Sequence, residues 1–214
     1  MGTIRKGVNG GFSGKAGSVV GAHWKSIDYI RGLSKKSNKP ASEAQLIQQA
    51  RFYSIAKFIM PIAPFVEVGF SQVNSERMTG VNAAIQANMK AAIAGTYPNF
   101  ALDYANIKIS SGSLQPGGNV YASVNSGILT VGWSDQAIAM QKGSLDDVVH
   151  ILLYLPSLDE FLTAPKPPVR GDATIDIELP DYFLGEKGHL WMFFTDRKNE
   201  RISRTTYLGE HDLI

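Results

Sequence analysis

The chain contains no cysteine among its 214 residues, which excludes disulfide bonds and thiolate metal sites. It also has no long apolar run. One of the longest apolar stretches, residues 55–66, contains Lys57 and two prolines and is too short to span a bilayer. The charged N-terminus runs into glycines rather than into apolar residues, so we expect no secretory signal and no membrane span. The expected location is the cytoplasm or an assembled particle.

Motifs of nucleotide binding and covalent catalysis are missing as well. A P-loop beside Gly14 and Lys15 would need a glycine at Asn9 and a hydroxyl at Ala16. The Gly-rich run holds no Gly-x-Gly-x-x-Gly, and the chain has no Gly-x-Ser-x-Gly elbow. We therefore predict a non-enzymatic protein with no catalytic residue, no cofactor and no identified small-molecule substrate.

Acids and histidines give no catalytic or metal pattern. The pairs Asp146-Asp147 and Asp159-Glu160 flank expected strands, and we interpret both pairs as solvated turn acids. A zinc site needs three or four converging ligands, and the histidines show no ligand spacing. They are His23, His150, His189 and His211. We expect no metal site, we interpret His150 and His189 as strand residues beside the core, and His23 is a candidate contact residue.

Charge is distributed unevenly along the chain. Residues 1–40 carry eight basic residues against one acid, Asp28, which gives +7. Residues 41–214 carry 13 basic and 18 acidic residues, which gives −5. Such asymmetry predicts that the basic segment touches something anionic. Nucleic acid, a membrane surface and the acidic body of another copy all fit this description.

Residues 1–40 form a basic, Gly-rich arm in this interpretation. The glycines disfavour a helix, and the β-branched and aromatic residues between 18 and 33 predict a β-hairpin with Lys25-Ser26 as its turn. The polar residues 34–40 end in a proline and predict an exposed linker.

Residues 41–100 predict a helical hairpin. Ser42 with Gln45 has the spacing of a capping box, and Pro61 should end the first helix. Apolar residues at helical spacing predict a second helix over residues 76–93, with Gly95 as its terminator.

Residues 101–214 predict a β-sandwich, because short alternating runs are separated by frequent turn signals. The expected strands are residues 107–110, 128–134, 148–154, 173–179, 189–195 and 202–207. Asn125-Ser126-Gly127 is one of the turns between them. The expected fold class is thus α+β: a β-hairpin arm and a helical hairpin, followed by the sandwich.

The sandwich resembles a fibronectin type III domain. Residues 129–134, Leu-Thr-Val-Gly-Trp-Ser, are similar to that fold's second strand with its buried tryptophan, here Trp133. Residues 173–180 and 190–194 resemble its fifth and sixth strands, although His189 or Trp191 stands where the family usually has a tyrosine. The resemblance implies a non-catalytic adhesion or spacer module.

A second resemblance covers nearly the whole chain. Residues 10–21 (Gly-Gly-Phe-Ser-Gly-Lys-Ala-Gly-Ser-Val-Val-Gly), Trp24-Lys25, residues 29–31, residues 35–40, residues 95–100 and residues 207–209 are similar to a family of uncharacterised Bacteroidota proteins. That family implies no activity. The turn Asn38-Lys39-Pro40 before the Gln-rich helix also resembles segments of phage structural proteins.

These observations predict a structural or interaction protein that self-assembles through its arm, as a component of a phage-like particle or a surface structure. A strand-forming arm can add to a sheet edge of a homo-oligomer or of another protein. The alternative is a nucleic-acid-binding protein, because lysines neutralise phosphates and aromatic rings stack on bases. The candidate partner-binding residues are Lys15, Trp24, Lys25, Tyr29, Arg31, Lys35 and Lys36.

Overall fold

Contacts divide the chain into two compact units, Met1–Gln45 and Leu46–Ile214. The computed structural model describes residues 3–4, 11–24, 27–34, 39–73, 78–134 and 143–214. Across these residues the fold is mixed α+β, with antiparallel sheets and a sandwich-like body, which confirms the expected fold class at this level. The helices and the sandwich lie together in the second unit. The division of the sequence into an arm, a helical hairpin and a sandwich stays a prediction.

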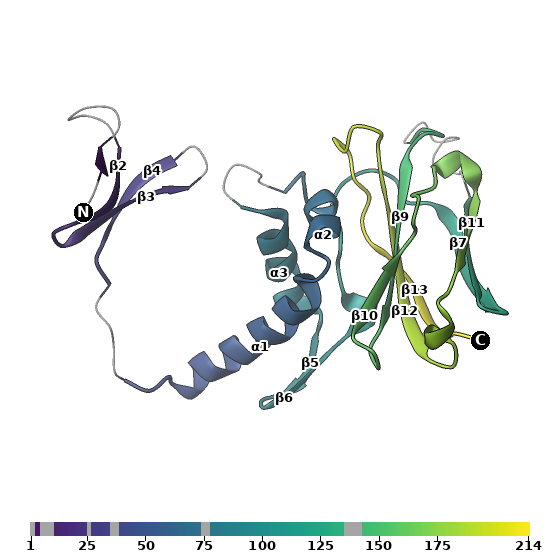
Figure 1. Cartoon of the computed structure of the whole chain (residues 1–214), viewed down its shortest axis with the longest axis horizontal. Coiled ribbons are helices and arrows are strands. Elements are labelled where there is room, and N and C mark those ends of the chain that lie inside the picture. The colour runs from purple at the N-terminus through teal and green to yellow at the C-terminus, as the bar shows by residue number, and fades with distance from the viewer. Residues whose placement is uncertain (1–2, 5–10, 25–26, 35–38, 74–77, 135–142) are drawn as a thin grey trace. The chain divides into compact units, whose positions relative to one another are not determined.

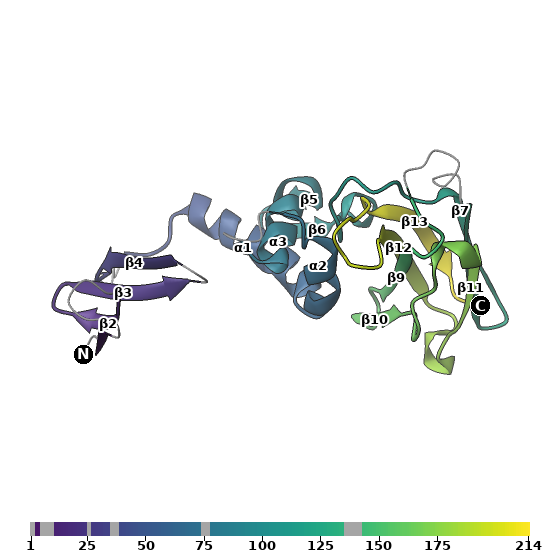
Figure 2. The same ribbon diagram turned by 90° about the horizontal axis from the view of Figure 1, so that it is seen from above.

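The first unit is a small antiparallel sheet with the strand order β1-β2-β3-β4. Its strands are β1 (Thr3–Ile4), β2 (Phe12–Ala16), β3 (Val19–Trp24) and β4 (Ile27–Gly32). The expected hairpin is present as β3–β4, in which Trp24 pairs with Ile27 (Figure 2). Its expected turn at residues 25–26 and most of the expected linker, residues 35–38, lie outside the described residues. Strand β2 was not predicted, because its segment contains glycine and precedes the expected hairpin.

Helix α1 (Glu43–Ile59) begins as the sequence predicts. Gln45 N donates to Ser42 Oγ at 3.4 Å and Ser42 N donates to Gln45 Oε1 at 2.9 Å, so the capping box is confirmed. The helix ends two residues before Pro61, whose ring is incompatible with a continued helix.

The predicted two-helix hairpin is wrong, because the described residues contain three helices. A short helix, α2 (Ala63–Gly69), follows α1 directly. Helix α3 (Gly80–Ala91) packs on α2, and the Glu67 carboxylate accepts the N–H of Gly80 at 2.9 Å. Gly95 does not end this helix but lies in β5 (Ile93–Thr96), which forms a hairpin with β6 (Asn99–Leu102).

Two antiparallel sheets form the sandwich (Figure 1). The three-stranded sheet has the order β11-β8-β7, with β7 (Gly118–Asn125), β8 (Ile128–Ser134) and β11 (Thr174–Glu178). The four-stranded sheet has the order β10-β9-β12-β13, with β9 (Val148–Leu155), β10 (Glu160–Thr163), β12 (Lys187–Thr195) and β13 (Thr206–Asp212). The expected turn between β7 and β8 is present, with Ser126 at φ 51° and Gly127 at φ 76°.

The four-stranded sheet is buried on both faces, which explains the continuous apolar runs of β9 and β12. On one face Leu152 and Trp191 join the apolar cluster of the helices. On the other face Leu153, Met192 and Phe194 join a second cluster with the three-stranded sheet. The order of layers is therefore helices, four-stranded sheet, three-stranded sheet (Figure 1).

Two predicted strands are wrong. Residues 107–110 form no strand, because the Asn88 side chain takes both backbone groups of Lys108, its N–H at 2.8 Å and its carbonyl at 2.7 Å. The last strand begins at Thr206 rather than at Ile202, which makes only an isolated bridge to Thr195. Strands β7 and β10 were not expected.

No single helix in the described ranges is long and apolar enough to cross a bilayer. Helices α1 and α2 together have the length and composition of a span, but the chain bends by 94° between them.

Candidate interaction surface

The glycines of the N-terminal sheet allow its strands to pack closely. The Phe12 ring lies over Gly21, where a side chain would collide with the ring and with the Phe12 carbonyl. Gly17 has φ +60° in the turn between β2 and β3, a conformation that glycine adopts at low cost. Phe12 thereby covers one face of the sheet.

Four of the predicted partner-binding residues lie on the opposite face, which we call the aromatic–basic face. The register pairs Val20 with both Lys15 and Arg31, and residues paired across strands point to the same side. Two residues further along β3, Ala22 pairs with Tyr29. Trp24 pairs with Ile27 and completes the same face, because side chains two apart in a strand share a face.

This face is open and carries positive charge. Trp24, Ile27 and Tyr29 are 44%, 46% and 43% exposed, high fractions for large apolar side chains. The arm's one acid lies on the other face, because Asp28 pairs with His23 at 2.7 Å between Oδ1 and Nδ1. His23 is therefore engaged with Asp28 and stands away from the aromatic–basic face.

Three further predicted residues, Lys25, Lys35 and Lys36, lie outside the described residues. Ile27 and Val20 belong to the face but were not among the predicted partner-binding residues. The alternation in residues 27–31 could have indicated Ile27, since Tyr29 and Arg31 follow it at a period of two.

The two strand histidines lie against aromatic rings beside the core. His150 stacks on Phe193 with ring centroids 4.6 Å apart, and its Nε2 lies 3.1 Å from Thr195 Oγ1. Burial lowers the pKa of His150 to about 4, so the ring is neutral at pH 7. His189 stacks on Tyr104 at 4.1 Å and contacts the Tyr207 hydroxyl at 2.8 Å, and burial lowers its pKa as well.

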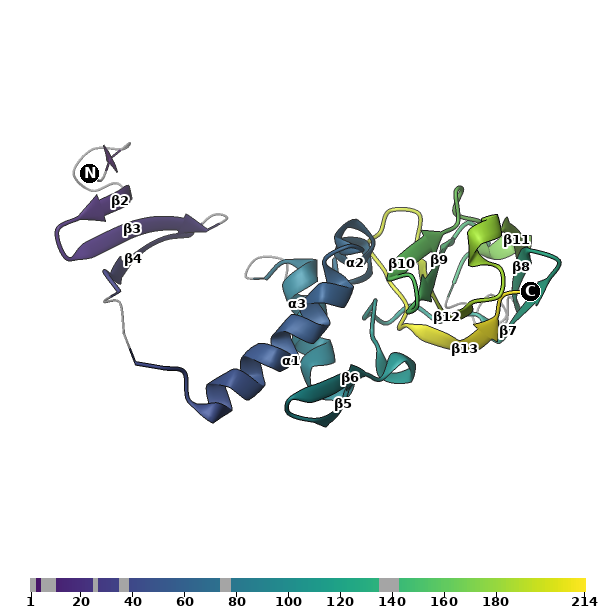
Figure 3. The same cartoon turned by 60° about the horizontal axis from the view of Figure 1, so that its bottom comes forward.

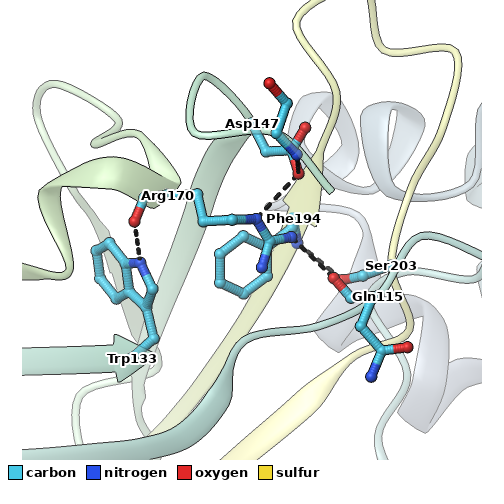
Figure 4. A network of polar contacts seen from close by, with 7 residues as sticks. Gln115, Trp133, Asp147, Arg170, Phe194 and Ser203 are labelled. Carbon is cyan, nitrogen blue, oxygen red and sulfur yellow. Dashed lines mark hydrogen bonds and ion pairs between the residues drawn. The ribbon is translucent and has the colours of Figure 1, made fainter. Parts of the chain in front are cut away.

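Asp147 is not a solvated turn acid, which corrects the sequence interpretation. Its Oδ2 accepts from Arg170 Nε at 2.9 Å, and the two side chains are 2% and 0% exposed (Figure 4). Arg170 Nη2 also donates to the Gln115 carbonyl at 2.8 Å, and the guanidinium lies 4.1 Å from the Phe194 ring centroid. The pair ties together the loops at one end of the sandwich. Asp147 also borders an open cavity of about 270 Å³, which Ser144 and Arg201 line as well, but its carboxylate is engaged with Arg170. We assign it to stability.

A polar cavity of about 450 Å³ lies beside Tyr207 and is flanked by Lys108 and Arg204. The hydroxyl of Thr205, which lines this cavity, already makes hydrogen bonds within the protein. Its Oγ1 accepts the N–H groups of Ile109 and Ser110, both at 2.9 Å. These contacts close the loop of residues 107–111 onto the segment before β13. Within the described ranges no group of three or more histidines, aspartates and glutamates is placed to hold a metal ion.

The fold and this surface define an α+β chain with a sandwich-like body and a separate N-terminal sheet. The sequence matches DUF6266, a family of unknown function, over residues 11–209, and the chain belongs to this family. The expected membership of an uncharacterised family is thereby confirmed. No curated protein matches the sequence.

Proposed function

We propose that the protein is a structural or interaction protein that assembles with further copies of itself through the aromatic–basic face. One observation carries the proposal: Lys15, Trp24, Tyr29 and Arg31, chosen from sequence as partner-binding residues, share one exposed face. Exposed aromatic residues beside arginine are the composition that interface centres favour.

The outer face of the three-stranded sheet is the partner surface in this proposal. The register places Asp176 and Glu178 of β11 on the same side as Ile128 and Tyr121, which are 41% and 55% exposed. No lysine or arginine occurs in β7, β8 or β11. An acidic, partly apolar sheet face is complementary to a basic, aromatic one, and such complementarity sets orientation and speeds association.

We also propose that the sandwich is fibronectin type III-like. Support comes from its seven strands in orders β11-β8-β7 and β10-β9-β12-β13, in which the second, fifth and sixth strands are the segments that resemble that family. A spacer module with a docking arm suits a component of a phage-like particle or a surface structure. The fold by itself does not specify either role.

A charge-swap experiment tests the assembly. Lys15→Glu with Arg31→Glu should dissociate the oligomer of the full chain at low salt, as measured by sedimentation velocity. Asp176→Lys with Glu178→Lys should do the same, and a mixture of the two variants should associate again. Salt should weaken the wild-type assembly, since exposed charges are screened over about 10 Å at 0.1 M ionic strength.

Ile30→Ser is the matched control, because Ile30 is 66% exposed on the other face of the same strand. It should leave assembly unchanged. A wild-type chain that stays monomeric at high concentration and low salt contradicts the proposal. If nucleic acid instead co-purifies, seen as a raised ratio of absorbance at 260 and 280 nm, and is lost on reversing Lys15 and Arg31, the nucleic-acid alternative takes its place.

A further inference from the structure

The polar cavity beside Tyr207 is a feature of the second unit that the proposed assembly does not use. Residues from two segments line it, 105–111 and 204–207, and its volume is about 450 Å³. Figure 3 shows both segments side by side where the helices meet the sandwich. Sites for small molecules typically have volumes of about 300–1,000 Å³, so the cavity is large enough to hold one.

The only charged side chains in the lining of this cavity are basic. Lys108 and Arg204 line it, and none of the other lining residues is an aspartate or a glutamate. Neither basic side chain makes an ion pair with another residue of the described ranges. Ser110, Ser111 and Tyr207 add hydroxyl groups to the same lining. Arginine, lysine and hydroxyl donors together are the groups that proteins use to hold phosphate oxygens.

Both basic residues stand on backbone that hydrogen bonds hold in place. The buried Asn88 side chain binds the N–H of Lys108 at 2.8 Å and its carbonyl at 2.7 Å. Thr205, next to Arg204, accepts two N–H groups of the 107–111 loop, both at 2.9 Å. These bonds fix the backbone positions of the two cations relative to each other before a ligand arrives. Such preorganisation lowers the free-energy cost of binding.

Two acids near Tyr207 have partners outside the cavity. Burial raises the pKa of Tyr207, and the charges of Glu210 and Asp103 raise it further. Asn106 Nδ2–H donates to Asp103 Oδ2 at 2.8 Å, and Glu210 Oε1 lies 3.7 Å from Lys187 Nζ. Neither acid lines the cavity. The Tyr207 hydroxyl keeps its proton at neutral pH and therefore adds no negative charge to the lining.

We propose that this cavity binds a small organic phosphate, a monoester whose phosphate group contacts Lys108 and Arg204. A phosphate monoester carries about −1.5 to −2 charges at pH 7, which matches two cations better than a single carboxylate does. The cavity is larger than a phosphate group alone, and Ala105 and the Tyr207 ring supply apolar surface for the organic part. The site lies in the second unit and does not depend on the aromatic–basic face.

Isothermal titration calorimetry of the full chain with phenyl phosphate, in a phosphate-free buffer of low salt, tests the site. Wild type should bind phenyl phosphate, and should bind inorganic phosphate more weakly because this ion lacks the ring. Lys108→Gln and Arg204→Gln should each weaken binding by about tenfold, since each removes one charge-assisted contact, and the double variant should give no binding heat. Lys166→Gln is the matched control and should leave the affinity unchanged, because Lys166 is exposed and does not line the cavity.

The absence of phenyl phosphate binding in wild type overturns the proposal, and so does binding that persists in the double variant. Tighter binding of benzoate than of phenyl phosphate overturns the choice of a phosphate ligand. The variants change exposed side chains, and their far-UV circular dichroism should match wild type. Lys15→Glu with Arg31→Glu should leave phenyl phosphate binding intact. Loss of binding in that variant would move the anion to the aromatic–basic face and overturn this site, so failure here is distinguishable from failure of the assembly.

Discussion

Arg170 and Asp147 form a buried ion pair, with Arg170 Nε 2.9 Å from Asp147 Oδ2. Around them, Asp147 Oδ2 accepts the N–H of Ser144 at 3.0 Å, and the Arg170 carbonyl accepts Trp133 Nε1–H at 2.9 Å. One residue pair therefore joins the loop before β9, the loop before β11 and strand β8 (Figure 4).

Removing one partner of this pair should be strongly destabilising. Arg170→Ala leaves the Asp147 carboxylate buried without its counter-ion, and such losses cost about 3–5 kcal/mol. Urea unfolding followed by tryptophan fluorescence measures the difference. The double variant Arg170→Met with Asp147→Leu should recover part of the loss, because apolar side chains of similar size can replace a buried pair. Equal losses in the single and double variants would show that packing, and not the ion pair, sets the cost.

Trp133 is the second test of this end of the sandwich. It is 3% exposed and its ring meets Phe194 edge-on at 6.1 Å. Trp133→Ala should cost about 3–5 kcal/mol through lost apolar contact and the cavity left behind. Trp133→Phe keeps much of the volume but loses the bond to the Arg170 carbonyl, so its cost should be smaller, about 1–3 kcal/mol. Denaturant titration followed by circular dichroism measures the free energy of unfolding of both variants. A loss below about 1 kcal/mol for Trp133→Ala would contradict its place in the core.

The sequence predicts best where burial on both faces produces continuous apolar runs. Strands β9 and β12 are of this kind, and their predicted positions agree closely with the structure. Strand β7 was missed because Gly118 and Asn119 precede a weak alternation. Helix α2 was missed because it is short and because two prolines, Pro61 just before it and Pro64 in its first turn, indicated a turn. The local sequence pattern predicts such a short helix poorly, because its packing on α3 stabilises it in the folded chain.

The candidate surface was predictable in composition but not in arrangement. The basic and aromatic residues could be chosen from the sequence, yet the register of β2 on β3 decides that Lys15 shares a face with Trp24. The pairing of Asp147 with Arg170 depends on contacts between residues 23 positions apart, which no local pattern encodes.

His150 should make stability depend on pH. The pKa of the native His150 is lowered to about 4 by burial, whereas in the unfolded chain it lies near its ordinary 6.5. The unfolded state therefore binds more protons between these values, and stability should fall as the pH drops from 6.5 towards 4, by about 3 kcal/mol in all. Above pH 6.5 this residue should contribute no pH dependence.

Denaturant titrations at pH 7.5, 6 and 5 measure this dependence. His150→Gln should flatten the part of the slope that this histidine causes. An unchanged slope in His150→Gln would show that the ring is not buried in its neutral form.

Gly69, in the last turn of α2, should not tolerate a side chain. A Cβ there would overlap the Ile109 carbonyl oxygen, and the Ser111 N–H donates to the Gly69 carbonyl at 2.9 Å. The atoms that the added Cβ would meet belong to the backbone of Ile109 and Ser110, so no rotamer change relieves the overlap. Gly69→Ala should therefore cost about 1–3 kcal/mol by forcing α2 away from residues 109–111. Gly32→Ala is the matched control, since no other atom lies within 4 Å of the added Cβ, and its thermal midpoint should equal that of wild type. Equal midpoints for Gly69→Ala and Gly32→Ala would show that α2 is free to shift and that this close approach does not hold it in place.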